Sequence, residues 1–321
     1  MQISLADIEA AASIVYAEMA PTPQLNWPLL SERLGTQVWV KHENHSPVGA
    51  FKIRGGLVYF ADLMAGGEPV QGVISATRGN HGQSVGYAAR HYGIPATIVV
   101  PKGNSTEKNA AMQAQGVTLI EHGEDFQAAR EYAIQLAEER GLLMVPSMHP
   151  LLVAGVATYS LELFQAVPDI DVVYVPIGLG SGICGMIAAR DALGLSTQVV
   201  GVVSAHATAY ADSFNAGRLL ESPVSTLLAD GMACRTPDPL ALEVILASVD
   251  HIVAVTDDEV AAAMGVIFEC THNVCEGAGA AAVAAAMQER AVNIGRRVAV
   301  VASGGNVDRS VFAEILARPS Q

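Results

Sequence analysis

The segment Val172–Leu193 reads VVYVPIGLGSGICGMIAARDAL, a pattern that indicates a strand, a glycine-rich turn and a helix in succession. The residues before the turn are mostly β-branched, which favours a buried strand. Glycine lets the backbone approach a bound anion closely, and the N-terminus of the following helix offers free N–H groups to it. We therefore expect this turn to bind a phosphate group.

The same alternation of strand and helix extends over the whole chain. Expected strands are Val38–Lys41, Gly72–Ser75, Ala96–Val100, Thr118–Glu121, Val172–Pro176, Gln198–Val203, His251–Val255 and Arg297–Ala302. Expected helices between them include Gln83–Tyr92, Phe126–Arg140, Ile183–Leu193 and Asp257–Thr271. This order predicts an α/β fold with mainly parallel sheets. The turns at Thr77–Gln83, Gly178–Gly185 and Ser303–Asn306 each follow a strand, so we expect them to meet in one crevice.

Composition narrows the class of protein. The 321 residues are 51% hydrophobic and 16% charged, which excludes a disordered chain. A net charge of −14 argues against nucleic-acid binding. No apolar stretch reaches the roughly 18 residues of a membrane span. The four cysteines lack CxxC spacing and no signal peptide is recognisable, so we expect a cytoplasmic protein with free thiols.

The string Gly180–Gly185 also matches GxGxxG, which would favour a dinucleotide-binding oxidoreductase. That fingerprint requires an acidic residue at the end of the next strand to hold the ribose. The residues that follow Gln198–Val203 are Ser204, Ala205 and His206, and none is acidic. A cofactor with a simple phosphate therefore fits this turn better than NAD does.

Lys52 is the candidate reactive residue. It lies between Phe51 and Ile53, just after the turn Ser46–Gly49. Burial among apolar neighbours lowers the pKa of a lysine, and a neutral amine can form a Schiff base with an aldehyde. A buried lysine combined with a phosphate loop is the pair that pyridoxal 5'-phosphate (PLP) requires.

Six motifs extend this interpretation: SPVGAFKIRGG (Ser46–Gly56), SATRGNHGQS (Ser75–Ser84), VPIGLGSGICG (Val175–Gly185), ADGMA (Ala229–Ala233), EGAGAA (Glu276–Ala281) and SGGNVD (Ser303–Asp308). In this order they resemble the fold-type II PLP enzymes, in the branch of serine/threonine dehydratases (threonine ammonia-lyases) and serine racemases. The resemblance covers essentially the whole chain. It implies a fold like that of tryptophan synthase β, with two three-layer αβα domains. The large PLP-binding domain would comprise residues 1–52 and 147–321, and the small mobile domain residues 53–146.

The resemblance also implies roles for individual residues. The catalytic residues would be Lys52, which holds PLP and moves the α-proton, with Thr77 and Glu276. The cofactor would further contact Phe51, Asn80 and Ser303, and its phosphate Gly178, Leu179, Gly180, Ser181 and Gly182. The substrate would be bound by Thr77, Arg78, Gly79, Asn80, His81 and Ser147. Taken singly, Asn80 and Ser303 could be turn residues, His81 a structural histidine and Glu276 a helix cap.

The activity implied is PLP-dependent β-elimination of water from a small β-hydroxy amino acid of the threonine or serine type. The products are a 2-oxo acid and ammonia. The short stretch after Asp308 leaves no room for a regulatory domain, so we expect a catabolic ammonia-lyase, and relatives of this branch suggest a homodimer. Acidic metal ligands are missing from Ser204–Tyr210, so we expect no metal.

Several alternatives stay open. Arg78 replaces a serine that acts in racemases, and a permanently protonated arginine is a poor proton carrier, so an amino-acid racemase is an alternative but racemase activity is not expected to be the main function. If Arg78 faces the site, it could bind the second carboxylate of a substrate such as 3-hydroxyaspartate; otherwise it points to solvent. An inert binding protein is disfavoured by the presence of Lys52, Asn80 and Ser303.

Overall fold

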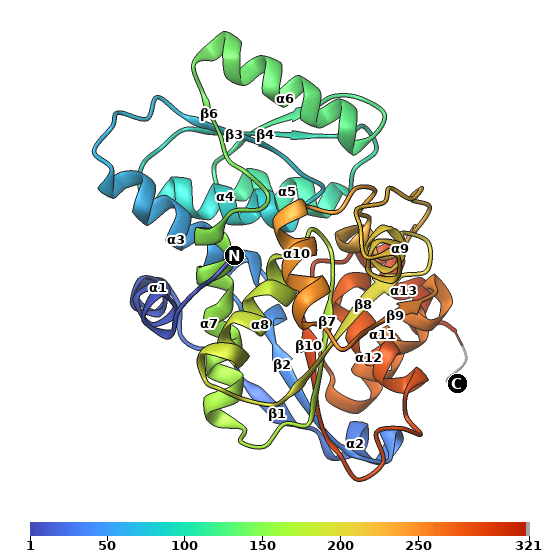
Figure 1. Cartoon of the computed structure of the whole chain (residues 1–321). Coiled ribbons are helices and arrows are strands. Elements are labelled where there is room, and N and C mark those ends of the chain that lie inside the picture. Colours follow the sequence, from blue (N-terminus) through green and yellow to red (C-terminus); the bar gives the residue numbers. More distant parts are fainter. Residues whose placement is uncertain (319–321) are drawn as a thin grey trace.

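The computed structural model describes residues 1–318, which form two sheets, each between layers of helices (Figure 1). The six-stranded sheet has the order β1-β2-β10-β7-β8-β9, and the four-stranded sheet β5-β4-β3-β6. Among the strands of residues 1–318, only the edge strand β1 runs antiparallel to its neighbour. The strands are β1 (Gln24–Asn26), β2 (Gln37–His42), β3 (Val73–Ala76), β4 (Ala96–Val100), β5 (Thr118–Glu121), β6 (Leu143–Met144), β7 (Val172–Pro176), β8 (Gln198–Ser204), β9 (His251–Val255) and β10 (Arg297–Ala302). This confirms the predicted α/β fold with two mainly parallel sheets.

Helices cover both faces of the six-stranded sheet, and together they form the large unit. One face packs against α2 (Pro28–Leu34), α11 (Asp257–Thr271), α12 (Gly277–Gln288) and α13 (Arg309–Leu316). The other packs against α1 (Leu5–Glu18), α7 (Pro150–Ala166), α8 (Ser181–Ala192), α9 (Ala209–Ala216) and α10 (Pro239–Ser248). Alternation along β10 produces the two cores, because Val298 and Val300 face one cluster while Ala299 and Val301 face the other.

The four-stranded sheet has its own core and forms the small unit with α4 (Asn80–His91), α5 (Thr106–Ala114) and α6 (Phe126–Arg140). Helix α6 covers one face, while α4 and α5 cover the other. In Figure 1 this unit lies above the large unit. Helix α3 (Lys52–Ala65) connects the two, because its Phe60 joins the core of the small unit while Ile53 packs near α1 and α7. No helix in the described chain is long and apolar enough to cross a membrane.

Most predicted strands have the predicted bounds, but three helix starts differ. Helix α4 begins at Asn80 instead of Gln83, α8 begins at Ser181 instead of Ile183, and the helix that starts at Lys52 was not predicted. Glycines near these starts weaken the helical pattern in the sequence. Tertiary packing decides instead: a Cβ on Gly55 would come within 2.7 Å of the carbonyl oxygen of Leu152 in α7.

The carboxyl ends of three buried strands, β3, β7 and β10, converge at one place. The turn after β3 leads into α4, the turn after β7 leads into α8, and the residues after β10 pair with the segment that precedes α3. In that pairing, the backbone N–H of Phe51 donates to the carbonyl oxygen of Ser303 at 3.1 Å, next to a bridge between Ala50 and Gly304. Two short 3-10 helices, η1 (Glu43–His45) and η2 (Asp230–Met232), lie beside these turns.

Candidate active site

Lys52 is the first residue of α3 and its amino group points to the glycine-rich turn. Its Nζ donates a hydrogen bond to Oγ of Ser181 at 2.7 Å and lies 4.8 Å from the ring centre of Phe51. Burial lowers the pKa of Lys52 to about 8. An appreciable fraction of this amine is therefore uncharged near neutral pH, as nucleophilic attack on a carbonyl requires.

The turn from Gly178 to Gly182 has the geometry of an anion cradle. Gly180 has φ of 107°, a left-handed conformation, and precedes the first residue of α8. A Cβ on Gly178 would lie 2.3 Å from the carbonyl oxygen of Gly231, and one on Gly180 would lie 2.5 Å from Cβ of Ala241. Only glycine fits at either position. The N–H groups of the first helical turn have no acceptor within α8, so they are available to an anion.

A small cavity lies beside the lysine. It is lined by Lys52, Gly55, His81, Ser147, Leu152, Val156 and Ser181. Nε2 of His81 is buried without a hydrogen-bond partner among the described residues. Burial, and secondarily the charge of Lys52, lower the pKa of His81 to about 3. The imidazole is therefore neutral, and its unsatisfied nitrogen is available to a ligand rather than to the protein.

The turn between β3 and α4 contains the predicted substrate residues. Oγ1 of Thr77 is buried and accepts the N–H of Gly79 at 3.0 Å. The carbonyl oxygen of Arg78 accepts a hydrogen bond from Asn104 at 3.2 Å. The guanidinium of Arg78 is partly exposed, has no hydrogen bond or ion pair to any described residue, and does not line the cavity around Lys52.

Asn80 and Glu276 form a hydrogen-bonded pair between the two units. Nδ2 of Asn80 donates to Oε1 of Glu276 at 2.5 Å, and Oδ1 of Asn80 accepts from Asn306 at 2.8 Å. Glu276 occupies the N-cap position of α12, but its carboxylate accepts no hydrogen bond from the N–H groups of the helix. Its side chain therefore does not cap this helix. Burial raises the pKa of Glu276.

Ser303 lies at the end of β10, buried below the same region. Its hydroxyl donates a long bond of 3.4 Å to the carbonyl oxygen of Ala278, and its own carbonyl accepts from Phe51. Leu179, in the glycine-rich turn, accepts a bond from the hydroxyl of Tyr210 at 2.8 Å. Of the predicted site residues, Lys52, His81, Ser147 and Ser181 line one cavity, whereas Thr77, Arg78 and Asn80 are not part of its lining.

Sequence reasoning did not identify Lys108 and Asp230 as charged neighbours of this site. Lys108 of α5 places its Nζ 2.8 Å from Oδ2 of Asp230 and 3.2 Å from Oε2 of Glu276. Lys108 belongs to a polar stretch of helix, where a lysine is normally solvated. The turn before α12 and the ADGMA segment were recognised, but their meeting with α5 is a consequence of the tertiary fold.

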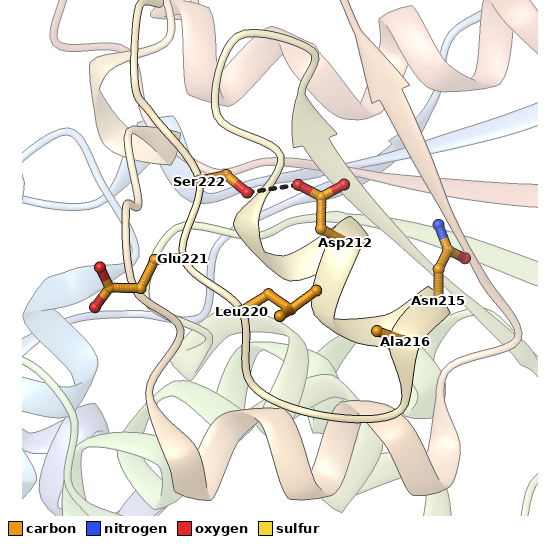
Figure 2. A pocket seen from close by; sticks show the side chains of 6 residues that line it. All are labelled: Asp212, Asn215, Ala216, Leu220, Glu221 and Ser222. Carbon is orange, nitrogen blue, oxygen red and sulfur yellow. Dashed lines mark hydrogen bonds between the residues drawn. The ribbon is translucent and has the colours of Figure 1, made fainter.

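A second pocket lies elsewhere on the large unit, beside α9 (Figure 2). It is lined by Asp212, Asn215, Ala216, Leu220, Glu221 and Ser222. The carboxylate of Asp212 is already occupied by the hydroxyls of Ser222 and Thr208. No predicted site residue lines this pocket, so the chemistry centres on Lys52.

Comparison with known proteins places this geometry in context. The family model described as pyridoxal-phosphate dependent enzyme matches residues 15–304. An L-threonine ammonia-lyase of Thermotoga maritima is 36% identical over 98% of this chain and 78% of its own length. An L-threo-3-hydroxyaspartate ammonia-lyase of Saccharomyces cerevisiae is 30% identical over 97% and 95%, respectively. The solved structure of threonine deaminase isoform 2 from Solanum lycopersicum superposes with a TM-score of 0.89 at 27% identity, covering 99% of this chain and 95% of that one.

Proposed function

The chain belongs to the family of pyridoxal-phosphate dependent enzymes, and on that premise we propose that it eliminates water from a small β-hydroxy amino acid of the threonine or serine type. The unsaturated amine that is released is then hydrolysed, which takes up one water and frees ammonia. The products are a 2-oxo acid and ammonia. The observation that carries the proposal is the placement of Lys52, with its lowered pKa, directly against Ser181 at the start of the glycine cradle.

The residues present fit PLP. Lys52 is an amine with the pKa needed for covalent attachment of an aldehyde. At Gly178 and Gly180 a Cβ would collide with neighbouring residues, so the turn keeps a bare backbone that a phosphate can approach, and it adjoins a helix N-terminus suited to a phosphate. His81 has a buried nitrogen that still lacks a partner. We assign the phosphate to residues 178–182, the ring to the vicinity of Phe51, Asn80 and Ser303, and the covalent link to Lys52.

Bound PLP supplies an electron sink that makes the α-proton of the amino acid acidic and allows a β-hydroxyl group to leave. Lys52 Nζ, whose pKa burial lowers to about 8, is in its neutral form the base that accepts the α-proton. The hydroxyl of Ser181 accepts a hydrogen bond from this Nζ and so holds it at the start of α8. Ser147 and His81 line the cavity beside Lys52, and we assign them, with the turn at Thr77–Asn80, to the substrate carboxylate.

A second candidate substrate is 3-hydroxyaspartate. The guanidinium of Arg78 has no partner among the residues described, although it belongs to the turn that we assign to the substrate. An arginine without a partner can bind a carboxylate through two parallel hydrogen bonds. The relative from Saccharomyces cerevisiae, named for this substrate, aligns over nearly the whole chain.

The test is a substrate panel with purified, PLP-loaded protein. We expect a 2-oxo acid to form from threonine or serine, and we expect the visible absorbance band of the covalent link between PLP and Lys52 to disappear in Lys52→Ala. The matched control is Lys102→Ala, because Lys102 is an exposed lysine paired only with Glu124 in the described structure. A protein that binds PLP but releases no 2-oxo acid from any β-hydroxy amino acid would contradict the proposed activity.

We further propose a cytoplasmic homodimer with a small unit that closes on the substrate. The four cysteines have free thiols, which suits a reducing compartment. Light scattering of the purified protein tests the dimer. Closure would be detected as a decrease in the radius of gyration, measured by small-angle X-ray scattering, when threonine is added to the PLP-loaded Lys52→Ala variant.

A further inference from the structure

Lys108 joins the small unit to the large unit through charge. Its Nζ lies 2.8 Å and 3.1 Å from the two carboxylate oxygens of Asp230 and 3.2 Å from Oε2 of Glu276. Lys108 is in the first turn of α5, whereas Asp230 in η2 and Glu276 at the start of α12 pack on the six-stranded sheet. The side chain of Lys108 is only 9% exposed. One cation and two carboxylates therefore lie at the contact between the units.

Neighbouring residues hold the first turn of α5 in this place. The Oγ of Ser105 accepts the N–H of Lys108 at 3.0 Å and bonds to the carboxylate of Asp308. Glu107 accepts the backbone N–H of Arg309 at 2.9 Å. A Cβ on Gly79 would lie 2.7 Å from Cδ of Lys108, so the turn assigned to the substrate rests directly on the lysine side chain.

The charge of Lys108 acts on Glu276. Burial raises the pKa of Glu276, the charge of Lys108 opposes this change, and Asp230 adds to it. Burial also works against the charge of Lys108, but Glu276 and Asp230 more than offset it and keep the pKa of the lysine above its usual value. The carboxylate of Glu276 is 2% exposed and depends on this lysine for a compensating charge.

Glu276 in turn fixes the amide of Asn80. An asparagine side chain has two N–H donors and one carbonyl acceptor. The acceptor of Asn80 is bonded to Asn306, and one donor is bonded to Glu276. The remaining N–H has no partner in the described structure. It is the group of Asn80 that can reach a bound ligand, and its direction is set by Glu276 and Asn306.

We propose that Lys108 is a positioning residue of this enzyme: docking of α5 on the large unit places its charge beside Glu276, and Glu276 then holds Asn80 toward the bound cofactor. This inference rests on the proposed function for the identity of the cofactor and the reaction. Opening of the small unit would withdraw the lysine and release Glu276, so closure and the orientation of Asn80 change together.

A double-mutant cycle tests the route through Glu276. The variants are Lys108→Met, Glu276→Gln and the combination, each as full-length PLP-loaded protein. Three quantities are measured: kcat with threonine and, in the absence of substrate, the visible absorbance spectrum and the PLP dissociation constant. We expect Lys108→Met alone to lower kcat about tenfold or more, the scale of a lost hydrogen bond to a charged group, and to change the spectrum or the dissociation constant. In the Glu276→Gln background the same change should alter kcat and the dissociation constant by less than about twofold.

Controls separate this role from a structural one. Lys108→Arg keeps the charge and should restore the spectrum, while the exposed Lys102→Met should behave as the parent protein. If Lys108→Met does not fold, Lys108→Gln takes its place in the cycle. Equal losses from Lys108→Met in both backgrounds, or an unchanged spectrum, dissociation constant and kcat, would overturn the proposal. A parent protein without dehydratase activity would reject the proposed function instead, and the substrate-free spectra would still decide whether Lys108 acts through Glu276.

Discussion

The amino group of Lys52 lies 2.7 Å from the hydroxyl oxygen of Ser181, although the two residues are 129 positions apart in the chain. This contact joins the first residue of α3 to the first residue of α8. It places a nucleophilic amine beside a helix N-terminus that is suited to bind a phosphate. Two functions that the sequence suggested separately, covalent attachment and phosphate binding, are therefore parts of one site.

Attachment of PLP to the PLP-free protein should depend on pH through Lys52. Burial lowers the pKa of this lysine to about 8, so the amine is mostly charged below that pH and mostly neutral above it. Only the neutral amine attacks an aldehyde. We expect the rate of PLP incorporation, followed by absorbance, to rise with pH up to about 8 and then to level off. Nα-acetyl-lysine, whose free side-chain amine has a pKa of roughly 10.4, serves as the control, and its rate of reaction with PLP should still be rising at pH 9. A protein profile that follows acetyl-lysine would contradict a buried amine.

Gly180→Ala should weaken PLP binding. Gly180 has a left-handed φ of 107°, and an added Cβ would meet Cβ of Ala241 at 2.5 Å. Strain of about 1–3 kcal/mol in a turn that binds the phosphate corresponds to roughly a fivefold to hundredfold loss of affinity. Gly194→Ala is the matched control, because Gly194 also has positive φ but nothing lies near its Cβ position. It should cost about 1 kcal/mol in unfolding free energy without affecting PLP affinity, measured by fluorescence titration. Equal PLP affinities of the two variants would argue against a cradle at this turn.

Arg54→Met should strongly destabilise the fold. The guanidinium of Arg54 is fully buried and binds Glu43 at 2.8 Å and Glu162 at 2.6 Å. Lys41 also binds Glu162, so the cluster has two cations and two carboxylates. Removal of one cation leaves a buried negative charge, which typically costs about 3–5 kcal/mol.

Urea unfolding measures this loss. Arg235→Met is the control, since that side chain is 73% exposed and should change the unfolding free energy by less than about 0.5 kcal/mol. The same small value for Arg54→Met would show that the buried cluster adapts to the loss of its arginine.

The sequence predicted most of the fold because parallel strands buried on both faces have a distinctive composition. The bounds of β4, β7, β9 and β10 agree with the predicted ones, as β-branched runs between turns would suggest. Helices that start at glycine-rich turns were predicted too late. Helices α4 and α8 begin directly after Gly79 and Gly180. Glycine is present there because of close packing and not because of helix propensity.

The site was predicted less completely, and the reason is physical. Lys52 and the glycine cradle leave a local pattern, since a turn and its chemistry occupy neighbouring residues. Lys108 leaves none, and the ADGMA motif does not reveal that its Asp230 meets this lysine, because the contact depends on the docking of α5 onto η2, two segments far apart in the sequence. A charged residue in a polar helix is usually solvated, so only the fold identifies this lysine as buried.

Arg78 is where substrate choice can be tested directly. Its guanidinium has no partner among the described residues, while its carbonyl oxygen is held by Asn104, so the turn can keep its shape without the side chain. Arg78→Ala should therefore leave the fold intact. If the arginine binds a second carboxylate, the variant will lose about tenfold or more in kcat/KM for 3-hydroxyaspartate, because a charge-assisted hydrogen bond is lost, and much less for threonine. We expect this selective loss, measured by 2-oxo acid release from each substrate. Equal losses with both substrates would assign Arg78 to the support of the turn and leave threonine and serine as the substrates.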